Sequence, residues 1–147
     1  MRREARIAMR GSLGCLVLLA LLLSAGCGST MRDVAIGRAG VTHLHQEMDA
    51  GQFDEIYAEA APELRNANTH DDFVAFLTSF HQRLGNVKDP TETGFNVNWT
   101  NSGTQVLLTY QTKFDKAAVR ETFTWRVSGG KALLLGYQIT YNVPLTQ

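Results

Sequence analysis

Residues 69–85, THDDFVAFLTSFHQRLG, carry the clearest helical signal in the chain. Thr69 and Asp72 have the spacing of a capping box at the start of a helix, and Gly85 is suited to end it. The apolar side chains between them recur at helical spacing and share one stripe: Phe73, Phe76, Leu77, Phe80 and Leu84. The sequence therefore predicts a helix over 70–84 whose aromatic stripe requires a broad apolar partner.

From residue 93 the apolar residues alternate with polar ones, as in TGFNVNWTNSGTQVLLTY (93–110). A period of two is typical of β-strands. Turn sequences at 101–103, 115–117 and 128–131 divide this region into four strands with short links, which predicts an antiparallel meander with one apolar face. In the fourth strand the expected apolar set is Leu133, Leu135, Tyr137, Ile139 and Tyr141.

Two further helices are expected upstream of the aromatic stripe. The first covers Val34–Ala50, with Asp33 as a candidate N-cap, and its two glycines either weaken it or permit close packing. The second is short and starts at Phe53, and Pro62 ends or restarts it. Helices followed by strands, without βαβ alternation, predict an α+β fold with two to three N-terminal helices on one face of a four-stranded antiparallel sheet.

The N-terminus has the three zones of a secretory signal. Four arginines lie in the first ten residues, the segment Leu13–Leu23 is apolar apart from one glycine, and small residues follow it. This apolar run is shorter than the roughly 20 residues that a membrane-spanning helix needs. The sequence Leu23-Ser-Ala-Gly-Cys27 resembles the bacterial lipobox, which implies removal of residues 1–26 and acylation of Cys27. The alternative is an ordinary cleaved signal followed by an incidental cysteine.

The expected organisation follows from this N-terminus. A signal peptide covers 1–26, lipidated Cys27 and a short tether cover 27–33, a single α+β domain covers 34–143, and a C-terminal tail covers 144–147. The membrane is then a partner through the acyl chains on Cys27. Resemblance to lipoproteins also implies the outer membrane, facing the periplasm, because the residue after the cysteine is not Asp.

Processing also limits the other partners and the chemistry. Loss of the arginine-rich start leaves the acidic residues in modest excess, which argues against nucleic acid as a partner. The remaining chain has one cysteine, Cys27, whose sulfur is committed to a thioether. A disulfide, a thiolate metal site and a cysteine nucleophile are thereby excluded.

Several segments resemble known folds and a group of small bacterial lipoproteins. Met48–Tyr57 is similar to the turn between the first two helices of cystatin-like and nuclear-transport-factor-2-like (NTF2-like) domains. Gln82–Gly85, Glu121–Trp125 and Gly136–Ile139 resemble small bacterial lipoproteins of an uncharacterised domain family in that fold. The resemblance implies a curved sheet that wraps a cone-shaped pocket, used for small ligands or for dimer contacts.

The sequence offers little catalytic chemistry. No glycine-rich phosphate loop or G-x-S-x-G elbow occurs, and no cofactor is expected. His43 and His45 point about 200° apart on a helix, and no H-x-x-x-H pattern exists, so no metal site is expected. The ordinary role for all four histidines is a solvated or cap-adjacent one.

Glu121 is the one residue that breaks the pattern, because it shares the apolar face of its strand with Phe123 and Trp125. A carboxyl group among aromatic rings has a raised pKa and can act as a general acid or base. The candidate pocket residues around it are Tyr57, Tyr110, Glu121, Trp125 and Tyr137. The alternative is that Glu121 reaches solvent and pairs with Lys113 or Arg120.

Three functions remain open at this level. The first is a lipid-anchored, non-catalytic cell-envelope domain that binds an apolar small molecule or a protein partner, or pairs as a homodimer through its sheet. The second is an enzyme that uses Glu121 as its acid/base. The third is a purely structural envelope lipoprotein without a ligand.

Overall fold

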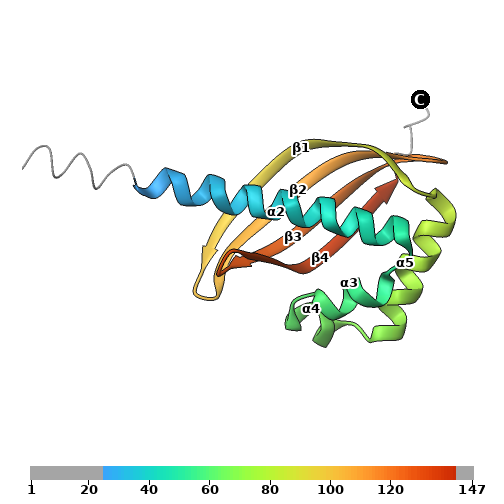
Figure 1. Cartoon of the computed structure of the whole chain (residues 1–147), viewed down its shortest axis with the longest axis horizontal. Coiled ribbons are helices and arrows are strands. Elements are labelled where there is room, and N and C mark those ends of the chain that lie inside the picture. Colours follow the sequence, from blue (N-terminus) through green and yellow to red (C-terminus); the bar gives the residue numbers. More distant parts are fainter. Residues whose placement is uncertain (1–24, 142–147) are drawn as a thin grey trace, which may run out of the picture. The chain divides into compact units, whose positions relative to one another are not determined.

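The computed structural model describes residues 25–141 (Figure 1). The chain divides into two compact units between residues 32 and 33, and the architecture given below is that of the second unit. Residues 1–24 of the expected signal peptide and the expected tail at 144–147 lie outside the described residues. Within residues 25–141, no helix has the length and apolar character needed to cross a bilayer.

Four helices precede four strands in the described part of the chain. The helices are α2 (Ala25–Ala50), α3 (Phe53–Glu59), α4 (Pro62–Ala67) and α5 (His70–Leu84). The strands are β1 (Val87–Thr100), β2 (Gly103–Phe114), β3 (Ala118–Ser128) and β4 (Lys131–Tyr141). The α+β prediction is confirmed, with four helices rather than two to three. Pro62 holds the preceding Ala61 in an extended conformation and restarts the chain as a separate helix.

Local signals set the ends of α5 but not the start of α2. The Thr69 hydroxyl accepts a hydrogen bond from the Asp72 amide, as the capping box predicts, and α5 ends at Gly85. Helix α2 is already helical at Ala25, so residues 27–33, where a short tether is expected, are helical. Asp33 lies inside this helix rather than at its N-cap, and its Oδ2 accepts a hydrogen bond from Thr104 Oγ1 at 2.7 Å.

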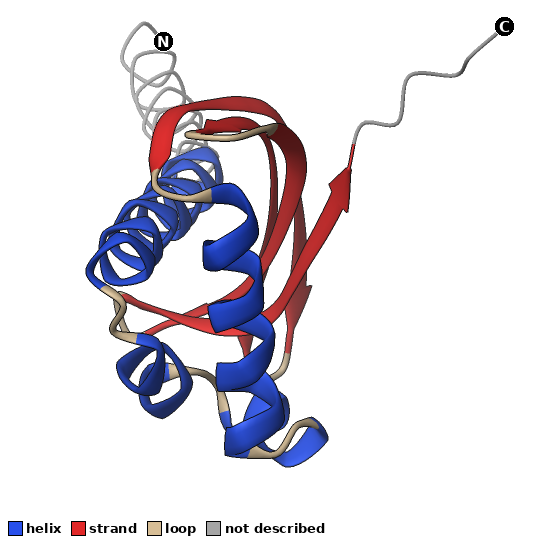
Figure 2. Ribbon diagram, turned by 90° about the vertical axis from the view of Figure 1, so that its right-hand side faces the viewer, coloured by secondary structure: helices blue, strands red, loops and turns tan. Residues whose placement is uncertain are grey.

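The sheet is an antiparallel meander in the order β1-β2-β3-β4. The β3–β4 turn contains two consecutive glycines, Gly129 and Gly130, with φ of 58° and 78°, which is the backbone of a type I′ hairpin. The helices gather on one face of the curved sheet and leave the other face uncovered (Figure 2). The core therefore lies between α2, α5 and the concave face.

Helix α2 lies close against the middle of the sheet because two of its residues lack a side chain. A Cβ placed on Gly40 would be 3.1 Å from the Trp125 ring, and one on Gly37 would be 3.3 Å from Val106. The close approach expected for these glycines is thus made against side chains of β2 and β3. A larger residue at Gly40 would push the helix away from Trp125.

One member of the predicted aromatic stripe is largely exposed. Phe73, Leu77, Phe80 and Leu84 are buried, whereas Phe76 is 43% exposed. At 100° per residue, Phe76 lies about 40° beyond Phe80, at the margin of the buried arc. Its ring instead contacts Phe80 and Tyr137, with centroid separations of 6.5 and 6.4 Å.

The predicted apolar face of β1 is also only partly covered. Phe95 and Trp99 lie opposite buried residues of β2, yet they are 48% and 67% exposed. The alternation assigned them to the correct face of the sheet. Phe95 and Trp99 stay partly exposed because β1 is an edge strand. Helix α2 packs through its glycines on side chains of β2 and β3 instead.

An irregularity in β4 overturns part of its predicted alternation. Thr124 pairs with Gly136 but Trp125 pairs with Leu134, so Leu135 is an extra residue between two consecutive pairs. The buried residue is Leu134, at 3% exposed, rather than Leu133 or Leu135. Toward the other end of the strand, Tyr137 and Ile139 pack against the core as predicted, whereas Tyr141 is 45% exposed.

Candidate functional site

Glu121 is fully buried in the centre of the core and has two polar partners. Its Oε2 lies 3.0 Å from His45 Nε2, and its Oε1 accepts a hydrogen bond from the Tyr137 hydroxyl. The exposed fraction of the Glu121 side chain is 0%, and that of His45 is 7%. The prediction that Glu121 reaches solvent and pairs with Lys113 or Arg120 is therefore wrong. Its carboxylate faces inward because it shares the buried face of β3 with Phe123.

Three elements bring this group together. Glu121 lies in the first half of β3, Tyr137 comes from the adjacent strand β4, and His45 reaches the carboxylate from α2. Aromatic rings surround the imidazole edge-on: Phe123 at 5.6 Å and Phe114 at 6.5 Å between ring centroids. These contacts hold the imidazole in place.

Burial changes the acidity of both tyrosines near Glu121. Removal of the Tyr137 hydroxyl from water, followed by the charge of Glu121, raises its pKa well above the usual value, so the phenol stays protonated and donates. Burial, with the charge of Glu92 as a second cause, raises the pKa of Tyr110 to about 12. Neither phenol is a base near neutral pH.

Tyr110 belongs to a neighbouring cluster. It pairs with Glu121 across β2 and β3, but its hydroxyl donates to Glu92 Oε2 at 3.2 Å. The Arg38 guanidinium donates to both oxygens of Glu92, each at 2.7 Å, and lies over the Phe95 ring. These charge-assisted hydrogen bonds hold the pKa of Glu92 below its usual value. They tie α2 to the edge strand β1.

The other predicted pocket residues lie apart from Glu121. The Tyr57 hydroxyl donates to the backbone carbonyls of Arg65 and Asn68 and so joins α3 to the end of α4. Trp125 is buried beneath α2, and its indole Nε1 has no hydrogen-bond partner among the described residues. Cys27 lies within α2, but its side chain is not among those described.

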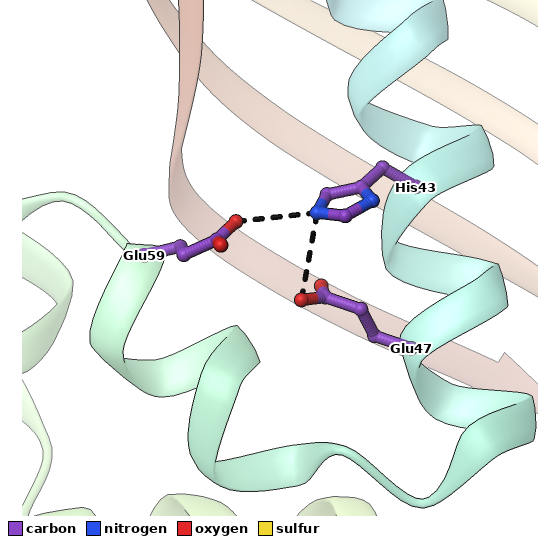
Figure 3. A group of neighbouring side chains, drawn as sticks. All are labelled: His43, Glu47 and Glu59. Atoms are coloured by element: carbon purple, nitrogen blue, oxygen red, sulfur yellow. Dashed lines mark hydrogen bonds and ion pairs between the residues drawn. The ribbon is translucent and has the colours of Figure 1, made fainter.

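A second polar cluster joins α2 to the end of α3 (Figure 3). His43 Nε2 lies 3.2 Å from Glu59 Oε2 and 3.5 Å from Glu47 Oε1, and one ligand atom from each residue lies within 4.8 Å of the others. His43 and Glu59 are exposed, whereas the Glu47 side chain is only 8% exposed. Burial, as the largest cause, raises the pKa of Glu47. This is the one group in residues 25–141 with donors arranged to hold a metal ion.

The cavities near these groups are small or lie at the surface. A cavity of about 50 Å³ is lined by His43, Glu47, Glu59 and Trp125. Clefts of about 330 and 390 Å³ adjoin Tyr137 and Tyr110 respectively, and a third of about 660 Å³ lies between α4 and β4. Glu121 lines none of these four spaces. The predicted pocket residues therefore do not share one of them.

Comparison with known protein families shows to which family the chain belongs. A family profile described as "Protein of unknown function (DUF4019)" matches residues 41–137, which is more than half of the chain. The chain belongs to the DUF4019 family. No curated protein gave a significant match. The part of the chain that matches DUF4019 contains the group of His45, Glu121 and Tyr137 and the cluster of His43, Glu47 and Glu59.

Sequence reasoning missed two features of this DUF4019 domain. His45 follows Val41 by four residues and thus shares the apolar face of α2, a position that places an imidazole in the core. His43 and Glu47 have the same spacing, which allows both to contact one ligand. A search restricted to histidine pairs overlooks this combination. Glu59 comes from another helix, so no spacing could have identified it.

Proposed function

We propose that this protein is a lipid-anchored, non-catalytic cell-envelope domain that binds a partner protein along strand β1. The observation that carries the proposal is the exposure of two large aromatic side chains on this edge, Trp99 at 67% and Phe95 at 48%. Exposed aromatic groups are typical of the centres of protein interfaces. The partner would add an extended segment to the sheet.

The second half of β1 is suited to pairing with another strand. Residues Phe95–Thr100 carry no charge, and their pairing with β2 is regular. Both irregularities of β1 lie in its first half, between Val87 and Asp89 and between Glu92 and Gly94. Charges and bulges protect edge strands from unwanted pairing, and Phe95–Thr100 has neither. An uncharged partner segment with alternating apolar side chains matches this surface.

The opposite edge of the sheet is protected. The Ala61 amide donates a hydrogen bond to the Leu134 carbonyl at 2.9 Å, and α4 packs against β4. A partner strand at β4 would compete with this contact. The difference between the edges supports β1 as the binding edge.

The alternative functions receive less support. The cavity behind Glu47 measures about 50 Å³, below the roughly 300–1,000 Å³ usual for small organic ligands, and the clefts of about 330, 390 and 660 Å³ that reach this size lie open at the surface. Both oxygens of Glu121 are occupied by His45 and Tyr137, and these partners, rather than the carboxylate itself, line the clefts of about 390 and 330 Å³. An enzyme that used Glu121 would need the core to open.

We also propose a specific fold class for the domain and a lipid anchor at Cys27. We assign the domain to the cystatin-like or NTF2-like class, because helices precede four antiparallel strands in chain order and one helix lies across the concave face. The lipobox-like sequence before Cys27 supports an outer-membrane lipoprotein that faces the periplasm. Acylation is tested by the mass of the mature chain, and Cys27→Ala should release the protein from the membrane fraction.

Site-specific cross-linking tests the binding edge. A photo-reactive side chain placed at Asn98 of the full chain should give one defined adduct in intact cells. The same group at Gln138, which is exposed on β4, is the matched control and should give none. Trp99→Ala should reduce the adduct at least tenfold, because buried Trp residues often contribute about 2 kcal/mol or more at interfaces. Phe76→Ala, which removes an exposed aromatic ring on α5, should leave the amount of adduct unchanged.

Several outcomes would contradict this proposal. Equal adducts at Asn98 and Gln138, or an adduct that survives Trp99→Ala, would mean that the edge is not the binding surface. An adduct with the mass of two identical chains would identify the occupant as a second copy. The absence of any adduct would favour a purely structural envelope protein.

A further inference from the structure

We propose that His43, Glu47 and Glu59 form a binding site for one divalent transition-metal ion, with Zn²⁺ as the best match. The inference is independent of the partner-binding edge. It concerns the cluster between α2 and α3, where one nitrogen and two carboxylate groups converge (Figure 3).

The ligand chemistry selects the class of metal. An imidazole nitrogen with two carboxylates suits Zn²⁺ and related ions, whereas Ca²⁺ and Mg²⁺ prefer sets made only of oxygen. Metal–ligand bonds of about 2.0–2.1 Å in a tetrahedral site place the ligand atoms about 3.3 Å apart. The two separations from His43 Nε2, 3.2 and 3.5 Å, fit that geometry. Two ionised carboxylates also balance a charge of +2.

Glu47 provides the second, independent observation. Its side chain is only 8% exposed, yet it accepts no hydrogen bond from the described residues, and its one ion-pair contact there is His43 Nε2 at 3.5 Å. That nitrogen lies closer to Glu59 and can donate only one hydrogen. With only His43 beside it among the described residues, a carboxylate so little exposed to water favours a cation as an additional partner.

The surroundings leave room for an ion and its water. The cavity of about 50 Å³ that all three side chains line exceeds the space of about 10–15 Å³ that one water needs. His43 is 57% exposed and Glu59 63% exposed, so an ion can enter from solvent. Three protein ligands leave the fourth tetrahedral position to a water molecule.

His70 offers an internal comparison. It also contacts two carboxylates, but Asp54 lies at Nε2 and Asp71 at Nδ1, at 2.7 and 2.9 Å. Those acceptors lie at different nitrogens of the ring and cannot share one ion with it. Convergence on a single nitrogen distinguishes His43 from His70.

The test uses the full chain, purified in detergent micelles and freed of metal by a chelator. Titration with Co²⁺ should produce the visible absorption of a tetrahedral nitrogen–oxygen site, and Zn²⁺ should displace it at one ion per chain. His43→Ala and Glu47→Gln should each weaken Zn²⁺ binding by at least tenfold, measured by calorimetry. His70→Ala is the matched control and should change the affinity by less than twofold.

Three results would overturn the site. The first is the absence of stoichiometric Co²⁺ binding in the unmodified chain. The second is a loss of Zn²⁺ affinity in His70→Ala as large as the loss in His43→Ala. The third is unchanged binding in Glu47→Gln and Glu59→Gln, which would reduce the interaction to a surface histidine. Circular dichroism of each variant checks the fold, and Glu47→Gln is expected to fold well because it removes a buried charge.

Discussion

Glu121 and Glu47 are both buried carboxylates, but their surroundings differ. Glu121 has a partner for each oxygen, His45 on one side and Tyr137 on the other, and no exposed surface. Glu47 lies at the edge of the core, accepts no hydrogen bond from the described residues and faces a small cavity. One carboxylate has a protein partner for each oxygen, whereas the other has only His43, at 3.5 Å, among the described residues.

The difference separates a stabilising role from a binding role. A buried polar group whose partners are all present fixes the arrangement of the elements that supply them, here α2, β3 and β4. A mostly buried carboxylate with a single distant partner, like Glu47, leaves one side free for a cation. Glu121, the acid that stands out on an apolar strand face, therefore has a stabilising role. Glu47, which is less conspicuous in the sequence, is better suited to bind a ligand.

Removal of the satisfied carboxylate should have the largest effect. Glu121→Ala leaves the largely buried His45 and Tyr137 without their partner, which we expect to cost about 3–5 kcal/mol in the free energy of unfolding. Urea denaturation followed by circular dichroism measures the loss. Arg120→Ala, an exposed neighbour on the same strand, should stay within about 0.5 kcal/mol. A loss below about 1 kcal/mol for Glu121→Ala would show that the network contributes little.

Neutralisation of the unsatisfied carboxylate should stabilise the protein. Burial holds the pKa of Glu47 above 4.5, so the stability that its neutral form provides is complete below that pH and is lost as the pH rises through the folded-state pKa. Glu47→Gln should therefore gain about 1 kcal/mol at pH 7 in metal-free buffer, and nothing near pH 4. Thermal melts at both values measure the gain.

The control for this variant is Glu55→Gln, which removes an exposed charge of the same sign on α3 that is the smallest of the causes raising the pKa of Glu47. Its effect should stay below about 0.5 kcal/mol at both pH values. Destabilisation by Glu47→Gln at pH 7 would mean that the carboxylate has donors that the described residues do not supply.

Substitution of Glu92 should have the smallest effect on stability, and this effect should depend on pH in the opposite direction to that of Glu47. The hydrogen bonds from Arg38 lower its pKa below 4.5, so its contribution is present above that pH and is lost as the pH falls through the folded-state value. Because the pair is partly exposed, Glu92→Gln should cost only about 0.5–1 kcal/mol at pH 7 and less at pH 3. Asp89→Asn, which breaks an exposed pair with Lys113, should have no measurable effect. An equal loss of stability in Glu92→Gln and Asp89→Asn would mean that the Arg38–Glu92 pair contributes no more than an exposed surface pair.

The sequence predicted the elements whose signals are local. Helix α5 was located within residues 70–84, because Thr69, the apolar spacing and Gly85 all lie inside that stretch. The four strands followed from alternation and from glycine-containing turns. The extra residue Leu135 has no such signal, since a bulge depends on how neighbouring strands pair, and the predicted burial of β4 shifted with it.

The polar clusters were only partly predictable for the same reason. Glu121 was conspicuous as an acid on an apolar face, but its partner His45 lies 76 residues away and meets it only through tertiary packing. Phe95 and Trp99 were assigned to the correct face, yet their exposure depends on which strands α2 covers. Contacts between elements decide each of these outcomes.

The distance in sequence between His45 and Glu121 affects how the chain is made. A protein is synthesised from its N-terminus, so the imidazole emerges long before the carboxylate that it meets in the finished fold. Until β3 has left the ribosome, His45 and the part of α2 that lies against Trp125 lack their partners in the core. A nascent chain interrupted before Glu121 would therefore be unable to complete this part of the core, even with β1 and β2 already made.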